Sequence, residues 1–327
     1  MMINSRIFRT AGPIALALML GGAQASRGVA QTAPANAAAL PGSSAELSAA
    51  PSLGAATAGT GMPAPGLSGK VADKAAAIAA SARDIFNRVP CLPPKGISQS
   101  TGALPHVAAK LAAHKAVVIV AFGSSSTQGH GATSPEFNYP NRLAARLHRK
   151  YPAAAITVLN RGKGGEDAPE MIKRLRAEVI DAKPDMVIWQ VGTNAVLRNL
   201  DLTSTVKTVE DGVATIQASG ADLVLVDPQY APAVNARGET ADRMVRLLNK
   251  VAHYRHVGIF PRFEVMRDWH DRQSLPFDTF VTKDGLHMND WGYACFAQLL
   301  GDDIIKSVDQ VQAGVRLPPA ATVNRPL

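Results

Sequence analysis

Five short apolar runs, separated by longer stretches with helical spacing, constrain the fold of this chain more than any other feature. The first run, Ala116–Phe122, contains no polar residue, which is typical of a strand covered on both faces of a sheet. Four more runs follow at Ile156–Leu159, Met186–Val191, Leu223–Val226 and Val257–Phe260. Strands that alternate with helices form parallel sheets with helices on both faces. We therefore predict an α/β fold around a parallel sheet of five strands.

Helical spacing of apolar residues marks segments between and after these strands. Three such helices are expected around Tyr139–Leu147, around Met171–Val179, and from about Trp291 into the region of Ile304. Open parallel sheets bind their ligands beyond the carboxyl ends of the strands. Polar residues that directly follow a strand are therefore the candidates for a functional site.

The first thirty residues, 1–30, have the pattern of an export signal. Two arginines precede the apolar run Pro13–Leu20, and small residues follow it, so that cleavage is expected after Ala25 or Ala30. The apolar run is short for a bilayer span, which disfavours a permanent membrane anchor. We expect a periplasmic or secreted protein with no stable membrane span after the signal is removed.

The rest of the chain divides by composition into four parts. Residues 31–68 form an Ala/Pro/Gly/Ser-rich tract that cannot bury enough apolar surface to fold, and we interpret it as a disordered linker. Residues 69–115 form an N-terminal helical segment expected to pack on the main domain, 116–310, and a tail follows at 311–327. Apolar residues in the N-terminal segment recur at helical spacing up to Pro90: Val71, Ile78, Ala82, Ile85 and Val89.

The net charge of +8 falls to 8 − 2 = +6 if cleavage after Ala25 removes Arg6 and Arg9. Nucleic acid or an anionic envelope polymer could bind such a basic protein. However, the basic clusters lie on two expected helices and in the loop between them, and we interpret them as solvated faces. Aromatic residues are not interleaved with them, so nucleic acid is not an expected partner. These basic residues are Arg142, Arg146, Arg149, Lys150, Arg161, Lys163, Lys173, Arg174 and Arg176.

The two cysteines, Cys91 and Cys295, have neither the C-x-x-C spacing of redox proteins nor the spacing of metal ligands. In an oxidising compartment they could form one disulfide between the N-terminal segment and the final helix, which is the interpretation we favour. The alternative is two unpaired thiols, with Cys295 filling space in the core.

Two polar blocks far apart in the sequence indicate nucleophilic chemistry. Gly123-Ser-Ser-Ser-Thr-Gln-Gly129 follows the first strand, and Asp284-Gly-Leu-His287 precedes the last helix. A serine hydroxyl becomes a nucleophile when an imidazole accepts its proton, and a carboxylate holds that imidazole in the required tautomer. A small hydroxyl-rich loop after the first strand could instead bind a phosphate, as in flavin-binding proteins of similar architecture.

Two more blocks follow the second and third strands. Asn160-Arg-Gly-Lys-Gly-Gly165 could present the backbone N–H of Gly165 to a developing oxyanion, and Gly192-Thr-Asn194 could add the amide of Asn194. Each block taken alone is also explained by an ordinary turn. Asp227-Pro-Gln-Tyr230, after the fourth strand, is expected to border the same cleft or to form a structural turn.

Taken together, over residues 116 to 307, the four blocks resemble the SGNH hydrolases, also called the GDSL lipase/esterase family. The resemblance implies a three-layer α/β/α, flavodoxin-like sandwich. It also implies that Ser125 is the nucleophile, His287 the general base and Asp284 its orienting acid. The oxyanion hole would consist of Gly165, Asn194 and the backbone N–H of Ser125, and no metal or organic cofactor is required.

The chain departs from the G-D-S pattern of the family, because Gly123-Ser124-Ser125 has serine in place of aspartate. Ser124 and Ser126 are therefore rival nucleophiles, while alignment through Thr127 and Gly129 favours Ser125. Asp278 is a rival to Asp284.

The expected activity is that of a serine esterase acting on a small carboxylic ester or an acylated glycan, for example O-acetyl groups on a polysaccharide. Acyl transfer to another sugar is a variant of the same chemistry. A flavin-binding protein and a non-catalytic glycan-binding module of the same fold are the alternatives.

Overall fold

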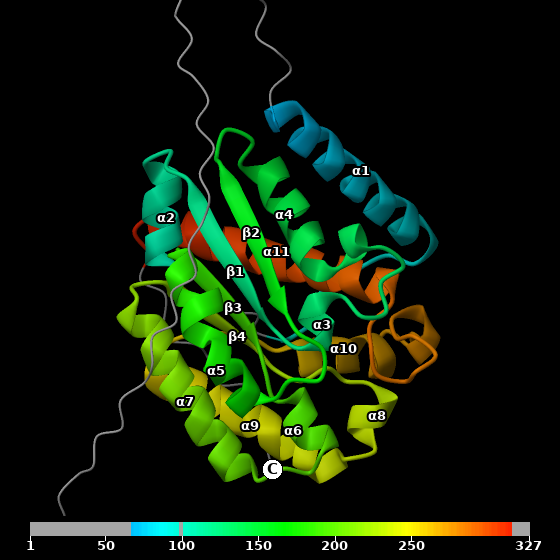
Figure 1. The fold of residues 1–327 in the computed structure, drawn as a ribbon. Coiled ribbons are helices and arrows are strands. Elements are labelled where there is room, and N and C mark those ends of the chain that lie inside the picture. The colour runs from blue at the N-terminus through cyan, green and yellow to red at the C-terminus, as the bar shows by residue number, and fades with distance from the viewer. Residues whose placement is uncertain (1–66, 98–100, 316–327) are drawn as a thin grey trace, which may run out of the picture. The chain divides into compact units, whose positions relative to one another are not determined.

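The computed structural model describes residues 67–97 and 101–315, which form an α/β fold with one parallel sheet of five strands (Figure 1). The order of the strands across the sheet is β2-β1-β3-β4-β5, and every neighbouring pair is parallel. The predicted fold class is confirmed. The strands are β1 (Val117–Gly123), β2 (Ile156–Gly162), β3 (Met186–Gln190), β4 (Asp222–Val226) and β5 (Gly258–Phe260).

Alternate side chains of β1 explain why its sequence is apolar throughout. Ile119 and Ala121 point into one buried cluster, while Val120 and Phe122 point into the other. Helices supply the remainder of both clusters, and the sheet therefore lies between two helical layers. The first cluster contains residues of α2 (Pro105–Ala112), α4 (Tyr139–Lys150), α10 (Arg262–Asp271) and α11 (Asp290–Gln312). The second contains residues of α5 (Ala168–Glu178), α6 (Thr193–Leu197), α7 (Leu202–Ala218), α8 (Pro232–Asn235) and α9 (Gly238–Arg255).

Several predicted boundaries differ from those of the structure. β2 extends to Gly162, although Asn160-Arg161-Gly162 were expected in the loop after it. Hydrogen bonding along β1 continues through the pair Gly123 and Gly162, and this extends the strand. α11 continues eight residues past Ile304 to Gln312 and so includes the first two residues of the predicted tail. The sequence did not lead us to predict α7, α9 or α10.

The predicted signal, 1–30, lies outside the described residues, as does the predicted linker 31–68 except for its last two residues. These two belong to α1 (Leu67–Arg88), which contacts α4 and α11. Short elements complete the fold: α3 (Ser125–Gln128), η1 (Pro135–Phe137), η2 (Ile180–Ala182) and η3 (Phe277–Thr279). Among the described helices, none has the length and apolar character needed to cross a membrane.

A disulfide joins Cys91 to Cys295 and so ties the segment after α1 to α11, with 5.4 Å between the two Cα atoms. The predicted disulfide is confirmed, and the alternative of two unpaired thiols is wrong. The indole Nε1–H of Trp291 also donates a hydrogen bond to the backbone oxygen of Val89 at 2.8 Å. The end of α1 is thus held at the start of α11 by one covalent bond and one hydrogen bond.

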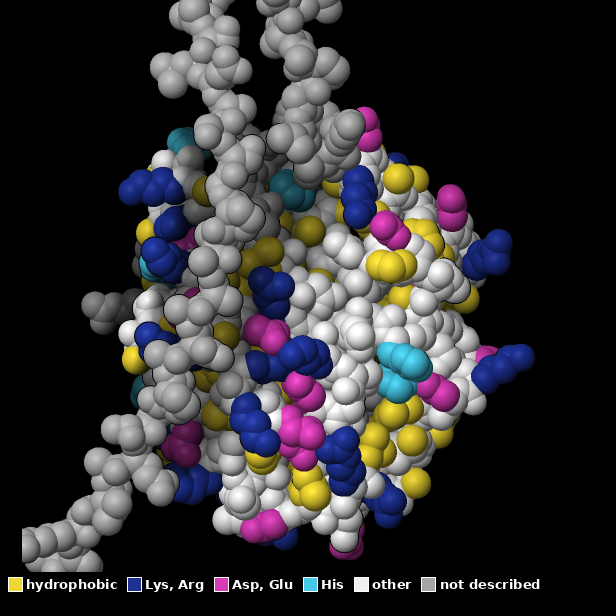
Figure 2. All heavy atoms as spheres, viewed as in Figure 1, with side chains coloured by type: hydrophobic (Ala, Val, Ile, Leu, Met, Phe, Trp, Pro, Cys, Tyr) yellow, Lys and Arg dark blue, Asp and Glu magenta, His cyan; other side chains and the backbone are white. Residues whose placement is uncertain are grey.

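The interpretation of the basic residues as solvated faces is wrong for Arg142 and Arg174, which are only 4% and 8% exposed. Arg142 donates from Nε to the backbone oxygen of Phe137 at 2.9 Å and lies over the ring of that residue. Several other members of the group form ion pairs with carboxylates, as Lys163 does with Glu178. Figure 2 shows basic and acidic side chains interleaved over the visible face.

Candidate active site

Ser125 lies where β1 turns into the short helix α3, at the carboxyl edge of the sheet. The turn is possible because position 123 is glycine: a Cβ there would lie 2.9 Å from Oε1 of Gln190 and would collide with the hydroxyl of Thr127. The side chain of Ser125 is partly exposed, whereas its neighbours Ser124 and Ser126 are each only 2% exposed.

The side chains of Ser125, His287 and Asp284 are joined in series by hydrogen bonds. Nε2 of His287 lies 2.8 Å from the Ser125 hydroxyl oxygen, and Nδ1 lies 2.6 Å from Oδ2 of Asp284. Serine and histidine are 162 positions apart in the sequence, and the fold brings them together at the ends of β1 and of the loop before α11. The three residues expected to act together therefore do converge.

Asp284 is held in its ionised form by four hydrogen bonds. Its Oδ1 accepts from the Thr282 hydroxyl at 2.6 Å and from the backbone N–H groups of Leu286 and His287 at 2.8 and 3.0 Å, while Oδ2 faces the imidazole. Partial burial raises the pKa of this carboxyl, but the hydrogen bonds outweigh burial and lower the pKa well below its ordinary value. An ionised carboxylate can only accept, so Nδ1 of His287 carries its proton toward Asp284 and Nε2 is left to accept from Ser125.

The rival residues occupy other positions. The hydroxyl of Ser124 donates to Oε1 of Gln190 at 3.0 Å, and Ser126 is buried. Asp278 lies on η3, where its backbone oxygen accepts from the side-chain amide of Asn289 at 2.9 Å. Nδ1 of His287 contacts Asp284 and not Asp278.

The turn Gly164–Gly165 lies beside Ser125. The backbone N–H of Gly164 donates to the side-chain oxygen of Gln128 at 2.9 Å, and a Cβ at Gly164 would lie 3.9 Å from the Cβ of Ser125. Gly165 has a φ of +80°, a conformation that favours glycine. The amide Nδ2 of Asn194 donates to the backbone oxygen of the next residue, Glu166, at 2.7 Å. Asn194 is thus linked to the residue that follows Gly165, and Gly164 adjoins the serine.

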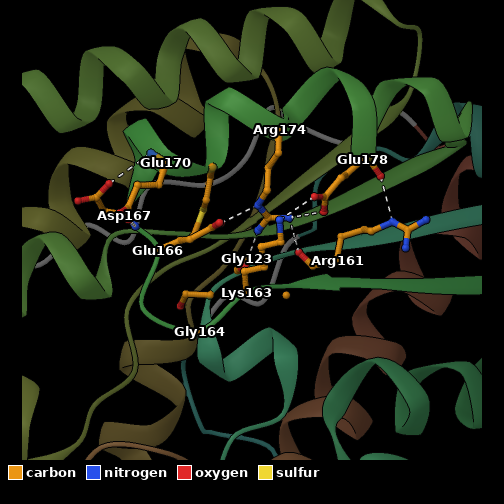
Figure 3. Close-up of polar contacts among 12 residues, drawn as sticks. Gly123, Arg161, Lys163, Gly164, Glu166, Asp167, Glu170, Arg174 and Glu178 are labelled. Carbon is orange, nitrogen blue, oxygen red and sulfur yellow. Dashed lines mark hydrogen bonds and ion pairs between the residues drawn. The ribbon is translucent and has the colours of Figure 1, made fainter.

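Arg174 connects this turn with the strand that leads to Ser125, as Figure 3 shows. Its Nη2 donates to the backbone oxygen of Gly123 at 3.1 Å, and its Nε donates to the carboxylate of Glu166 at 2.6 Å. Nη1 reaches the carboxylate of Glu178 at 2.8 Å and the backbone oxygen of Arg161 at 3.0 Å. The sequence contained a signal that was missed: Arg174 follows Met171 by three positions and precedes Leu175, so it lies near the buried face of α5.

Two buried glutamines, Gln190 and Gln229, form hydrogen bonds with the polar blocks that contain Ser124, Thr193 and Leu286. Oε1 of Gln190 accepts from both the backbone N–H and the hydroxyl of Ser124, each at 3.0 Å. Oε1 of Gln229 accepts from the Thr193 hydroxyl at 2.9 Å, and its Nε2 donates to the backbone oxygen of Leu286 at 3.4 Å. Gln229, whose role was open in the sequence, therefore links the block of Asn194 to the loop of His287.

His130 lies against the candidate triad. Its ring centroid is 4.3 Å from that of His287, and its backbone N–H donates to the backbone oxygen of Ser125 at 2.9 Å. Ligand atoms of His130, Asp284 and His287 lie within 4.8 Å of one another, and such donors suit Zn²⁺. Two of these three residues are already joined by the hydrogen bond that orients His287.

A model of the Non-GDSL lipase-like family matches residues 90–310. The chain belongs to this family. The match covers the whole sheet and every residue of the candidate site, and it begins just after α1 ends at Arg88. No curated protein is similar enough in sequence to count as a relative.

Solved structures similar to this Non-GDSL lipase-like chain include a two-domain esterase active on acetylated mannans, co-crystallised with mannopentaose. The TM-score is 0.54 at 24% identity, covering 69% of this chain and 58% of that one. A variant of an acetyl-xylooligosaccharide esterase from Geobacillus stearothermophilus gives a TM-score of 0.50 at 19% identity, covering 59% of this chain and 94% of that one. At these identities the likeness shows that the fold is shared, and nothing beyond the fold.

Proposed function

We propose that this protein is a serine esterase in which Ser125, His287 and Asp284 form the catalytic triad. The observation that carries the proposal is the unbroken series of hydrogen bonds from the Ser125 hydroxyl through the imidazole to the Asp284 carboxylate. Family membership over residues 90–310 supports it independently.

In the proposed reaction, Oγ of Ser125 attacks the ester carbonyl carbon while its proton passes to Nε2 of His287. The ionised Asp284 stabilises the resulting imidazolium. The bond between the carbonyl carbon and the alcohol oxygen then breaks, and the imidazolium returns the proton to that oxygen. Water, deprotonated by the same imidazole, attacks the acyl-serine, releases the carboxylic acid and restores the Ser125 hydroxyl.

The oxyanion that forms at each step needs hydrogen-bond donors fixed in place beforehand. We assign this role to the backbone N–H groups of Ser125 and Gly165 and to the side-chain amide of Asn194. The contacts of Gly164 and Asn194 with the neighbouring loops support the assignment. Each such donor contributes on the order of 100- to 1000-fold in rate.

An O-acetyl group on a polysaccharide is the proposed substrate, and the proposed location is the periplasm or the cell exterior. Two proteins that share the fold act on acetylated mannans and acetylated xylo-oligosaccharides. The disulfide between Cys91 and Cys295 and the export-signal pattern of residues 1–30 support an oxidising compartment.

The proposal is tested by hydrolysis of p-nitrophenyl acetate. We expect turnover by the wild type and a loss of about 10,000-fold or more in kcat for Ser125→Ala and for His287→Ala. Ser204→Ala, a change at an exposed serine on α7, is the matched control and keeps the wild-type rate. A fluorophosphonate should label Ser125, as located by mass spectrometry. Equal rates in wild type and both site variants would eliminate the mechanism.

A further inference from the structure

A pocket of about 750 Å³ lies between the end of α1 and the start of α11, and its volume is within the range of small-molecule sites. We propose that this pocket binds the alcohol part of the ester, and that this part is an uncharged carbohydrate chain. The inference rests on the proposed esterase function and specifies its substrate. The walls of the pocket include Asp84 and Arg88 from α1 and Gly131 from the loop after α3. Opposite them are Asp278 from η3 and Asp290 and Trp291 from α11.

The wall of the pocket comes close to the Cβ of His287 at Gly131. Gly131 lines the pocket, and a Cβ at that position would lie 3.1 Å from the Cβ of His287 and would collide with the backbone oxygen of Met288. Position 131 therefore has to be glycine for the pocket wall to lie this close to the histidine. The ring of His130, the preceding residue, lies against that of His287.

Proton transfer by His287 places the alcohol part of the ester on the His287 side of Ser125. In ester hydrolysis the histidine gives its proton to the departing alcohol oxygen, so the alcohol must lie next to the imidazole. The oxyanion donors assigned to Gly165 and Asn194 belong to the β2–α5 loop and to α6, whereas the pocket is lined by other segments. A sugar whose acetyl group reaches Ser125 can thus extend past His130 into the pocket.

The charge of the pocket indicates which kind of chain fits. Three carboxylates line it, those of Asp84, Asp278 and Asp290, against the single guanidinium of Arg88. This excess of negative charge repels an anionic polymer. The carboxylates of Asp84 and Asp278 are on exposed residues, where they can accept hydrogen bonds from sugar hydroxyls.

The wall that carries Asp84 and Arg88 lies outside the part of the chain shared with the family, since the match begins at residue 90. The disulfide and the hydrogen bond from Trp291 to Val89 fix this wall in position before a substrate arrives. Such preorganisation lowers the free-energy cost of binding. α1 is therefore a substrate-selecting element that lies outside the residues matched by the family model.

The test compares a neutral acetylated oligosaccharide, an acetylated oligouronate and p-nitrophenyl acetate as substrates for the full chain. The double variant Asp84→Lys, Asp278→Lys should lower kcat/KM for the neutral oligosaccharide, relative to that for p-nitrophenyl acetate, by about tenfold, as expected for losing hydrogen bonds to charged groups. The same ratio for the oligouronate should rise. Asp73→Lys, the same charge change on an exposed residue of α1 about 16 Å along the helix from Asp84, should change neither ratio.

Calorimetric binding of the deacetylated neutral oligosaccharide gives a second readout that needs no turnover. We expect binding to wild type and at least tenfold weaker binding to the double variant. Unchanged ratios together with unchanged binding would overturn the pocket proposal while leaving the esterase intact. A wild type that hydrolyses none of the three esters but binds the oligosaccharide through Asp84 and Asp278 would overturn the esterase and keep the pocket.

Discussion

At the scale of single residues, Arg174 has the widest reach in the candidate site. Its buried guanidinium donates to the backbone oxygen of Gly123 at the end of β1 and to that of Arg161 on β2. It also donates to the carboxylate of Glu166, the residue that follows Gly165. It thereby fixes the distance between the loop of the proposed nucleophile and the loop of the proposed oxyanion donors. Electrostatic stabilisation of an oxyanion depends on donors that are already in position, so Arg174 acts as a positioning residue.

We expect Arg174→Met to lower kcat for p-nitrophenyl acetate by about 100-fold, because a displacement of the donors by about 1 Å costs that much. KM should change little, since the pocket lies elsewhere. The kcat of Arg174→Lys should lie between those of the wild type and Arg174→Met, because lysine keeps the charge but cannot make the forked contacts. Arg176→Met, at an exposed position of the same helix, is the control. A rise in KM with unchanged kcat in Arg174→Met would contradict the assigned role.

The same scale shows which site residues the sequence could predict. Asp284 and His287 are three positions apart, and Ser125 follows a strand within a block of small residues. Local pattern marked these blocks as candidates, and the resemblance of the combined blocks to a known family selected the three residues. Arg174 and Gln229 contact their partners across different elements, and such contacts depend on the register of the sheet. No local pattern encodes that register for polar side chains.

At the scale of elements, all five strands were predicted from their apolar runs, which burial explains for β3, β4 and β5. β2 lies at the edge of the sheet and is only partly buried, and its run stops at Leu159, before the strand ends. α7 was missed since its buried face includes Thr205 and Gly212, which dilute the apolar spacing. Gly212 is required there because the ring of Trp189 occupies the space of a side chain. Packing against Trp189 on β3 therefore explains why position 212 is glycine, and the helix itself does not require it.

The segment that follows α1 carries a tertiary restraint that can be removed by reduction. The disulfide closes a loop over a sequence separation of 204 residues. In the chain-entropy account, such a bond stabilises the folded state by about 5 kcal/mol at most, and measured values are typically about 2–4 kcal/mol. We expect Cys91→Ala, Cys295→Ala to lower the free energy of unfolding in urea by that typical amount.

Wild type in dithiothreitol should match the double variant, and the double variant should not respond to the reductant. If α1 forms the pocket wall, its loosening should reduce the rate with the neutral oligosaccharide more than the rate with p-nitrophenyl acetate. A double variant as stable as the oxidised wild type would show that the non-covalent contacts of α1 are sufficient.

At the scale of the whole molecule, the two helical layers bury carboxyl groups that are not part of the site. Asp222 on β4 accepts from the backbone N–H groups of His106 and Val107, and burial raises its pKa to about 6. Asp303 on α11 is 5% exposed, its Oδ2 has no hydrogen-bond partner among the described residues, and burial raises its pKa to about 7. Asp284 has the opposite shift, because its hydrogen bonds favour the ionised form.

Asp303 makes the pH dependence of folding testable. In the unfolded chain its carboxyl loses the proton near pH 3.8, whereas in the folded protein it keeps the proton to about pH 7. At this group the folded state therefore binds more protons between these values, and the contribution of Asp303 to stability falls as the pH rises from 4 to 7. At about 1.4 kcal/mol per pKa unit, this decline amounts to at most about 4 kcal/mol.

Asp303→Asn cannot ionise and should lack this decline in stability, as measured by urea unfolding at pH 4, 5, 6, 7 and 8. Asp181→Asn, at an exposed position, should follow the wild type. Parallel stability curves for wild type and Asp303→Asn would mean that the buried carboxyl titrates normally in the folded protein.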